Sequence, residues 1–311
     1  MEIPLLNFYK LEIFTAVIET GSFSKAAERL LLTQSAISQH ISDLENSLGT
    51  RLFDRGPRGV KLTESGEKLR DYTVQILRLV AEAQNAVTNI NNLKDGQVSI
   101  GATPGVNVYL LPEWLKTFSS RYPNLTVAAQ TGTTDEVIAS LLNRQLDIGI
   151  VEGEIEVEDH PAERLGVLVL RESDLYVIVG RDHPFCKLDS IPAEALNDQP
   201  FIARQSRSQT RIWSDMMLAQ MNIQPRIVAE FDNQETMKQA VSSGMGITIM
   251  PDYAVKNEVQ MKLLRALPVD GFSLKRHVKL TWNKDHLFTP TTVAFLRHLA
   301  RSFPQISALI G

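Results

Sequence analysis

Apolar residues recur at helical spacing in the N-terminal part of the chain and predict three short helices. Their apolar positions are Leu11, Phe14, Val17 and Ile18; Ala26, Ala27 and Leu30; and Ile37, Ile41, Leu44 and Leu48. Gly21 is predicted to end the first helix, because glycine adopts the left-handed conformation without strain. Ser24 and Thr33 are predicted to cap the second and third helices. The pattern indicates a compact helical head in which two short helices are joined by a tight turn.

A longer apolar stripe follows from Thr63. Its members lie alternately three and four residues apart, at Leu69, Tyr72, Ile76, Leu79, Ala83, Ala86, Ile90 and Leu93. This is the a/d pattern of a coiled coil, and no Pro or Gly interrupts it. The stripe favours pairing with a helix of another chain. Packing on its own domain is the alternative, because periodicity does not identify the partner.

Beyond residues 94–97 (KDGQ), strand-like and helix-like segments alternate up to the end of the chain, which predicts an α/β fold in two lobes. We expect the chain to cross between the lobes near 162–170 and 265–272. The predicted division is a head at 1–65, a linker helix at 66–95 and an α/β part at 96–311. Within that part, lobe I covers about 96–164 and 270–311, and lobe II about 165–269.

The composition is that of a globular protein, with 43% hydrophobic and 22% charged residues. The N-terminus shows no export signal, which predicts a cytoplasmic protein. Cys186 is the single cysteine, so a multi-cysteine metal site is excluded. The net charge of -4 argues against nucleic-acid binding by the chain as a whole. Residues 51–61, however, hold four basic residues against Asp54 alone.

Polar side chains occupy the side of the third helix opposite its apolar residues. Gln34, Ser35, Ser38 and Gln39 offer short and amide side chains of the kind that reach base edges in a major groove. Such a polar face is by itself also typical of an ordinary surface helix. The preceding helix, the tight turn and the basic segment that follows favour DNA reading.

The segment FTAVIETGSFSKAAERLLLTQSAISQHISDLENSLGTRLFDR, followed by LTESGEKL, resembles the winged helix-turn-helix head of LysR-type transcriptional regulators. This resemblance implies that Gln34, Ser35, Ser38 and Gln39 approach DNA, and that Arg58 of RGPRGV is the wing arginine of the minor groove. Arginine suits a narrow A·T-rich groove because the negative potential is enhanced there. Arg51, Arg55 and Lys61 are either phosphate contacts or solvated surface charges.

The same family has a linker helix and a two-lobed effector domain like that of periplasmic solute-binding proteins. The fold class expected is therefore an all-α winged helix-turn-helix with a long linker helix, followed by an α/β two-lobed effector domain. The resemblance implies a homodimer on a dyad-symmetric operator in double-stranded DNA, assembly into a homotetramer, and RNA polymerase as a further partner.

Lobe I contains two candidate effector-binding segments. Thr103 lies directly after a strand and before a helix, where a hydroxyl and free backbone N–H groups can hold an anion such as a small organic or inorganic acid. Thr133 and Thr134 have the same strand-to-helix setting. Thr133 together with Glu136 also forms a capping-box pattern, which needs no ligand.

Lobe II contains the segment RQSRSQTR, whose hydrogen-bonding residues are Arg204, Gln205, Ser208, Thr210 and Arg211. It resembles a REPGSGTR-like segment in one branch of the family, but half of it departs from that pattern. The ligand of that branch therefore cannot be transferred, and a solvated polar loop is the alternative. Gly246 lies in a turn that the family places near the cleft, although backbone geometry also explains a glycine there.

Enzyme motifs are missing from the sequence. It has no Walker A loop, no H-E-x-x-H and no G-x-S-x-G, and its six His residues form no pair with metal-ligand spacing. We therefore expect no catalytic residue, cofactor or metal. The prediction is a sequence-specific DNA-binding transcriptional regulator controlled by a small-molecule effector between two lobes. The alternative is a solute-binding sensor without a DNA role.

Overall fold

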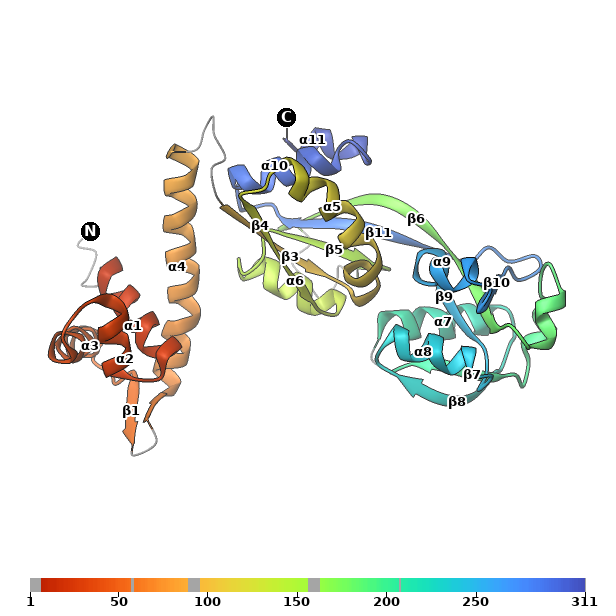
Figure 1. Ribbon diagram of the computed structural model, residues 1–311, viewed down its shortest axis with the longest axis horizontal. Helices are drawn as coiled ribbons and strands as arrows, with labels where there is room; N and C mark the ends of the chain where they lie inside the picture. The colour runs from red at the N-terminus through yellow and green to blue at the C-terminus, as the bar shows by residue number, and fades with distance from the viewer. Residues whose placement is uncertain (1–6, 57–58, 89–95, 156–162, 207, 311) are drawn as a thin grey trace. The chain divides into compact units, whose positions relative to one another are not determined.

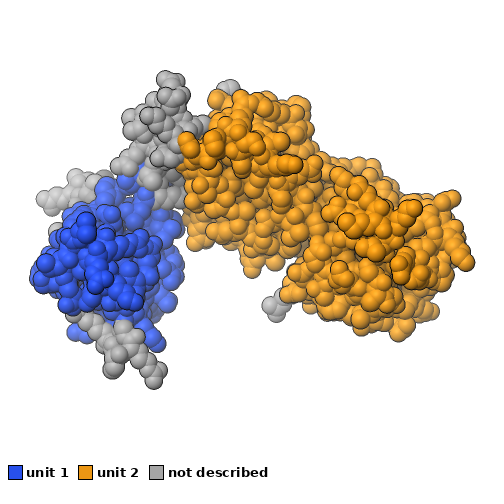
Figure 2. Space-filling view, in the orientation of Figure 1, with its two compact units in different colours: residues 1–90 blue, residues 91–311 orange. Residues whose placement is uncertain are grey.

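The computed structural model of the chain describes residues 7–56, 59–88, 96–155, 163–206 and 208–310. The chain divides into two compact units, residues 1–90 and residues 91–311 (Figure 2). None of the helices in the described part combines the length and the hydropathy that a bilayer crossing requires. Each unit has its own hydrophobic core.

The first unit is a winged helix-turn-helix with a long helix attached (Figure 1). Its elements are α1 (Phe8–Thr20), α2 (Phe23–Leu30), α3 (Gln34–Leu48), β1 (Phe53–Gly56), β2 (Gly59–Leu62) and α4 (Glu64–Thr88). β1 and β2 pair as an antiparallel hairpin, which forms the wing. The core includes Phe14, Val17, Ile37, Ile41 and Leu44, all at most 1% exposed. The predicted apolar faces of the first and third helices are confirmed, except that Leu48, at the end of α3, is 39% exposed.

Two of the three predicted helix-end residues are confirmed. Gly21 ends α1 in the left-handed conformation, with φ 63°. The Thr33 hydroxyl caps α3 by accepting the backbone N–H of Ala36 at 3.2 Å. The prediction for Ser24 is wrong, because Ser22 caps α2 and the helix begins one residue before Ser24, at Phe23. α2 starts at Phe23 because the ring of this residue is buried in the core of the head.

α4 begins where predicted, and the Thr63 hydroxyl accepts the N–H of Gly66 at 3.0 Å. Its first seam residue, Leu69, packs against the core of the head. Farther along, Tyr72 is 65% exposed and Leu79 is 38% exposed. Within the described part of α4, the seam residues therefore change from packing against the head to forming an exposed apolar edge. Ile90 and Leu93 of the predicted seam lie outside the described residues.

The second unit is built on a mixed sheet of seven strands among the described residues, in the order β10-β6-β11-β5-β3-β4, with β9 also paired to β6. β3, β4 and β5 are parallel to one another, whereas β6 and β11 are antiparallel to their neighbours. A separate parallel pair joins β7 and β8. The strands are β3 (Gly96–Ala102), β4 (Leu125–Thr131), β5 (Ile148–Glu152), β6 (Leu165–Gly180), β7 (Pro200–Arg204), β8 (Arg226–Phe231), β9 (Thr248–Pro251), β10 (Leu264–Leu267) and β11 (Lys275–Asn283).

Helices cover these strands in the βαβ manner that the alternating pattern predicted. The longer helices are α5 (Leu111–Arg121), α6 (Thr134–Leu142), α7 (Gln209–Gln220), α8 (Gln234–Ser242), α9 (Asp252–Gln260) and α10 (Pro290–Leu299), and the short ones are η1 (Val106–Leu110), η2 (Pro184–Lys187), η3 (Ala193–Leu196), η4 (Pro304–Ile306) and α11 (Ser307–Ile310). η1 is a π-helical turn that runs directly into α5. The apolar spacing did not indicate this π-turn.

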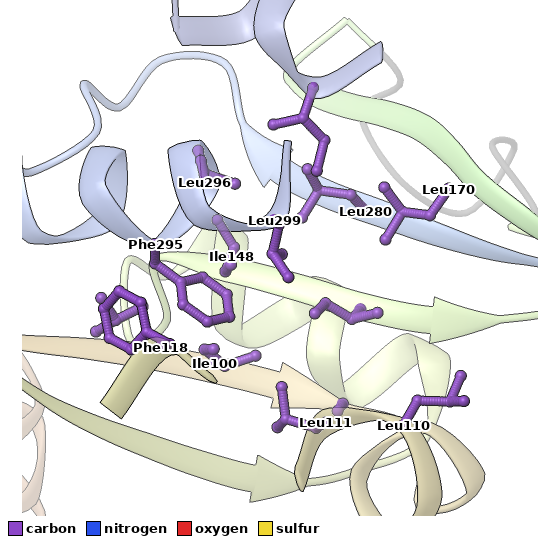
Figure 3. Packing of buried hydrophobic residues seen from close by; sticks show 14 of the residues in the cluster. Ile100, Leu110, Leu111, Phe118, Ile148, Leu170, Leu280, Phe295, Leu296 and Leu299 are labelled. Atoms are coloured by element: carbon purple, nitrogen blue, oxygen red, sulfur yellow. The ribbon is translucent and has the colours of Figure 1, made fainter. Parts of the chain in front are cut away.

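Two groups of hydrophobic clusters define the lobes. In lobe I, Phe295, Leu296 and Leu299 of α10 pack over Ile100 of β3 and Ile148 of β5 (Figure 3). In lobe II, separate clusters form around the C-terminal half of β6, together with β7, β9 and α7 to α9. The predicted two-lobed α/β fold is confirmed.

β6 and β11 are the strands that run through both lobes, and they stay paired along the crossing, from Leu165 with Asn283 to Asp174 with Lys275. Leu165 and Leu170, predicted to belong to lobe II, pack in the cores of lobe I. Leu175 belongs to a core of lobe II. The chain therefore passes between the lobes at 171–174 and returns at 275–278, because one continuous strand contributes to both cores.

The turn of the helix-turn-helix contains a strained residue. Leu31 has φ 56°, in the left-handed region, and is 92% exposed. We expect Leu31→Asn to raise the free energy of unfolding of the head by about 1 kcal/mol, because asparagine tolerates this conformation and no packing is lost. The check is a denaturant titration followed by far-UV circular dichroism. All three Trp residues lie in the second unit, so a transition without a change in Trp fluorescence reports on the head.

Leu31→Ala is the matched control, because it removes the same exposed side chain but supplies no polar group that can hydrogen-bond locally in the left-handed conformation. Equal stabilisation by both substitutions would show that the backbone conformation of Leu31 is not the source of the gain.

Candidate functional site

The exposed face of α3 is the candidate DNA-reading surface. Gln34, Ser35 and Gln39 are exposed and Ser38 is half-buried, while the opposite face of the helix is in the core. The Ser35 hydroxyl lies 3.0 Å from the Thr33 hydroxyl. The amide of Gln39 donates to the carboxylate of Asp43 at 2.8 Å, which orients this side chain along the helix. The structure thus brings the four predicted residues together on one helix.

The basic residues predicted near the wing are placed only in part. Arg51 is exposed just before β1, and its carbonyl accepts the Thr63 hydroxyl at 2.7 Å. Lys61 is exposed on β2. Arg55 belongs to β1, but its side chain lies outside the described part of the structure, as does the whole of Arg58. Of the cations whose side chains are described, Arg51 thus lies just before the wing and Lys61 lies on its second strand.

A cavity of about 230 Å³ lies in the second unit, where strands of both lobes end. Its lining residues are Thr103, Pro104, Gly105, Thr131, Gly132, Thr133, Thr134, Glu136, Glu152, Arg204, Gln205, Ser208, Gln209, Thr210, Asp232 and Gln234. They follow or end the parallel strands β3, β4 and β5 of lobe I and β7 and β8 of lobe II. Ligands of open α/β sheets bind at such carboxyl ends, so this is the candidate effector site.

Four threonines contribute to the lobe I wall, at positions 103, 131, 133 and 134. The buried Thr103 hydroxyl accepts the backbone N–H of Glu152 at 3.2 Å, which ties the end of β3 to the end of β5. The Thr133 hydroxyl accepts the N–H of Glu136 at 3.3 Å, and the Glu136 carboxylate accepts the N–H of Thr133 at 2.8 Å. The capping box seen as the alternative role for Thr133 is therefore present. Both residues still line the cavity.

The lobe II wall contains the cation of the cavity. Arg204 is 8% exposed, and its guanidinium donates to the backbone carbonyl of Asp232. Burial lowers the pKa of Arg204, although a guanidinium remains protonated at neutral pH. Gln205 is exposed, and Ser208 precedes α7 as its N-cap without a side-chain capping bond. Arg204, Gln205, Ser208 and Thr210 all line the cavity, as a ligand-binding role requires.

Helix N-termini from both lobes converge on the cavity. Lining residues begin the helical segment at Pro104, α6 at Thr134, α7 at Gln209 and α8 at Gln234. The first backbone N–H groups of a helix have no partner within the helix, and the helix dipole places positive potential there. Together with Arg204, these termini create a site suited to an anion.

A buried cation joins the two lobes beside the cavity. Arg276 of β11 is 3% exposed, and its Nη1 lies 3.5 Å from the carboxylate of Glu152 in lobe I. The same guanidinium donates to the Thr210 hydroxyl of lobe II at 3.0 Å and stacks over the ring of Trp213, 5.6 Å from its centroid. Gly153 is required next to it, because a Cβ atom at this position, where φ is 106°, would collide with the guanidinium.

A second interlobe contact lies at η1. The hydroxyl of Tyr109 in lobe I donates to the Glu235 carboxylate of lobe II at 2.7 Å. Lys238 of α8 lies over the Tyr109 ring, 4.9 Å from its centroid, and pairs with Glu235 at 2.9 Å. Burial and the bond to Glu235 raise the pKa of Tyr109 well above its usual value, so this hydroxyl keeps its proton. The contact therefore links α8, which begins at the cavity, to lobe I.

The sequence prediction included two residues that the structure places outside this cavity, and it missed several that line it. Arg211 pairs with Asp215 at 2.8 Å and with Glu230 at 2.7 Å. Gly246 does not line this cavity; it lines a separate one that includes Gly180 and His183. A Cβ atom on Gly246 would collide with the carbonyl of Pro200, so backbone packing explains the glycine. The residues missed are Pro104, Gly105, Thr131, Gly132, Glu136, Glu152, Gln209, Asp232 and Gln234. The signal for Glu152 was its position as the last residue of a buried strand.

Both units match known families. A family model described as the LysR substrate binding domain matches residues 91–304, and one described as the bacterial regulatory helix-turn-helix protein of the lysR family matches residues 8–67. A probable RuBisCO transcriptional regulator of Nostoc sp. is 34% identical over 297 residues, which cover 94% of this chain and 88% of that protein. The chain therefore belongs to the LysR family of transcriptional regulators.

Two solved structures are similar in fold. Full-length CbnR complexed with its target DNA has a TM-score of 0.70 and 22% identity, covering 96% of this chain and 100% of that one. The regulatory domain of CcmR from Synechocystis PCC6803, in complex with 2-PG, has a TM-score of 0.60 and 26% identity, covering 67% of this chain and 98% of that one. The protein is thus a DNA-binding transcriptional regulator with a C-terminal effector domain.

The bond between Thr103 and Glu152 predicts a stability effect. We expect Thr103→Val to lower the free energy of unfolding by about 1–3 kcal/mol, because the buried N–H of Glu152 loses its acceptor. Thr103→Ser keeps the acceptor and should cost much less. Urea unfolding followed by Trp fluorescence measures both, since every Trp lies in the second unit. Equal losses in the two variants would contradict this role of the hydroxyl.

Proposed function

We propose that this regulator binds a dyad-symmetric operator as a homodimer, through α3 and the wing, and that a small acid bound between lobe I and lobe II controls it. The single observation that supports the control step is the convergence of Arg204 and several helix N-termini on one cavity. The 230 Å³ volume lies below the range of roughly 300–1,000 Å³ of drug-sized ligand sites, which favours a small organic or inorganic acid.

We propose DNA-binding roles for the polar residues on the exposed face of α3 and for the basic residues near the wing. Gln34 and Gln39 can form paired hydrogen bonds with adenine, and Ser35 and Ser38 can bond either base or phosphate. Arg51, Arg55 and Lys61 are proposed to contact phosphates, and Arg58 to enter the minor groove, as the family resemblance implies. Two copies of α3 related by a two-fold axis would contact half-sites about one helical turn, or a multiple, apart.

The dimer is proposed to form through α4. Its exposed seam residues, Tyr72 and Leu79, are the apolar edge that a second copy of the helix would cover. Effector domains would then join dimers into a homotetramer. We also propose that the DNA-bound regulator contacts RNA polymerase, because a regulator bound at a promoter changes transcription by recruiting the polymerase or by blocking its access.

The proposed control is a shift between interlobe arrangements. A ligand that contacts Thr103 and Thr133 of lobe I and Arg204 of lobe II favours the arrangement in which it reaches all of them. Only this differential affinity can move the equilibrium. The contacts of Arg276 and the Tyr109–Glu235 bond are the interactions that would adjust when the lobes move. The new arrangement would alter how dimers assemble on DNA.

The proposal places the protein in the cytoplasm and assigns it no reaction, cofactor or metal. Family membership supports this assignment over a solute-binding sensor without a DNA role. Turnover of a bound acid by the purified protein would overturn the part of the proposal that denies catalysis.

Binding-site selection on the purified protein, followed by footprinting with and without small acids, tests the whole proposal. We expect a dyad-symmetric site whose footprint changes with a ligand. Absence of any sequence preference at moderate salt, where non-specific phosphate binding is suppressed, would contradict the DNA role. A footprint unchanged by every acid that binds would contradict the proposed control.

Gln34→Ala should lower the affinity for the selected operator by about 1–3 kcal/mol, because a paired contact with a base is lost. Its affinity for a scrambled duplex should stay the same. Fluorescence anisotropy on both duplexes at one salt concentration measures the difference. Gln220→Ala, an exposed glutamine on α7 of the other unit, is the matched control. Equal loss on both duplexes would show that Gln34 does not distinguish bases.

Ile76→Asp should convert the dimer to a monomer, because a carboxylate in an a/d seam cannot be buried against the partner helix. Val74→Asp is the control, since Val74 is 53% exposed on the same helix but off the seam. Sedimentation velocity at low protein concentration distinguishes the two variants. A dimeric Ile76→Asp variant, or a monomeric Val74→Asp variant, would count against this seam.

A further inference from the structure

Two side chains of the recognition helix α3 are bonded to each other. Gln39 and Asp43 lie four residues apart, so one turn of the helix brings them side by side. The Nε2 atom of Gln39 lies 2.8 Å from the Oδ1 atom of Asp43. Gln39 is exposed, and Asp43 is half-buried. A carboxylate is repelled by the phosphates of DNA, so its position next to a residue proposed to read bases calls for a function.

The chemistry of Asp43 decides which end of the Gln39 amide faces it. A carboxylate only accepts hydrogen bonds, whereas a glutamine amide has an NH₂ donor at one end and a carbonyl acceptor at the other. Asp43 therefore binds the NH₂ group and repels the carbonyl oxygen. One of the two N–H groups is used in this bond. Gln39 is left with a free acceptor, its Oε1 atom, and with one remaining N–H.

A fixed acceptor on α3 distinguishes between bases. In the major groove, adenine and cytosine each present an exocyclic NH₂ group, which is a donor. Guanine presents N7 and O6 and thymine presents O4, and all three of these atoms are acceptors. The remaining N–H of Gln39 can also bind N7 of adenine. An oriented Gln39 thus matches adenine best, cytosine next, and guanine and thymine least.

We infer that Asp43 is a positioning residue, which orients the amide of Gln39 so that it selects a base with an amino group at one position of each half-site. This inference rests on the proposed function, because it takes α3 to be the helix that reads the operator. Asp43 itself contacts no base. Its charge lowers the affinity for every duplex, and its bond to Gln39 adds discrimination between bases.

Gln39→Ala locates the position that Gln39 reads. Binding-site selection with the wild type and with this variant identifies the base whose preference is lost. Each of the four bases is then placed at that position in both half-sites, and fluorescence anisotropy on the full-length protein measures the affinities. We expect adenine to bind tightest and cytosine next. Guanine and thymine should bind more weakly than adenine by about fivefold or more, because an acceptor would face an acceptor.

Asp43→Asn tests the positioning role. An asparagine amide can both donate to and accept from Gln39, so the Gln39 amide is no longer held in one orientation. The ratio of the affinities for the adenine and thymine duplexes should fall to about twofold or less. All four affinities should also rise together, because a negative charge near the phosphates is lost. The ratio is the readout because this common change cancels in it.

Two further variants separate orientation from charge. Asp54→Asn, at an exposed position on β1, removes the same charge from the head and should leave the ratio unchanged. Asp43→Glu keeps a carboxylate four residues from Gln39 and should retain the preference for adenine. An unchanged ratio in Asp43→Asn would overturn the positioning role. So would an equal loss in Asp43→Asn and Asp43→Glu, because the acceptor would then not matter.

The remaining outcomes separate this inference from the proposed function. A wild-type preference for guanine or thymine at the position of Gln39 would overturn the inference and leave operator recognition standing. The same holds if Gln39→Ala changes the preference at no position. If the wild type shows no sequence preference anywhere in the selected sites, the proposed DNA role fails together with this inference.

Discussion

The effector domain depends on a buried guanidinium shared by two lobes. Arg276 lies in the stretch of β11 that passes between the lobes, and it contacts Glu152 on one side and Thr210 and Trp213 on the other. A buried charge without its partner costs several kcal/mol, so the ends of β5 and α7 must stay close to it. Since both ends belong to the cavity wall, this one cation positions parts of two walls.

The cavity itself follows from a topological rule applied in both lobes. Parallel strands place their carboxyl ends at one edge, and the helices that follow begin there. β3, β4 and β5 of lobe I and β7 and β8 of lobe II all end at the cavity. The result is a site at which several helix N-termini converge beside the buried Arg204 guanidinium. Communication with the DNA-binding head requires only that a ligand bind the interlobe arrangements with different affinity.

Local patterns were sufficient for much of the head and for part of the site. The buried face of α3, the cap by Thr33 and the end of α1 at Gly21 are short-range features, because helix periodicity and capping bonds extend over a few residues. The capping box of Thr133 and Glu136 is of the same kind. The local pattern gave a wrong prediction where a contact between residues distant in the chain decides the structure. Burial of Phe23 in the core moved the cap of α2 from Ser24 to Ser22.

By itself, the sequence determined the class of fold, the polar face of α3 and several threonines at strand ends, since each depends on neighbours along the chain. Only the tertiary structure decided which of these residues share a cavity. Glu152 and Gln234 joined Thr103 and Arg204 there, while Gly246 packed against Pro200. The crossing at 171–174 was likewise decided by pairing of β6 with β11. Such contacts join residues far apart in the chain, and no local spacing encodes them.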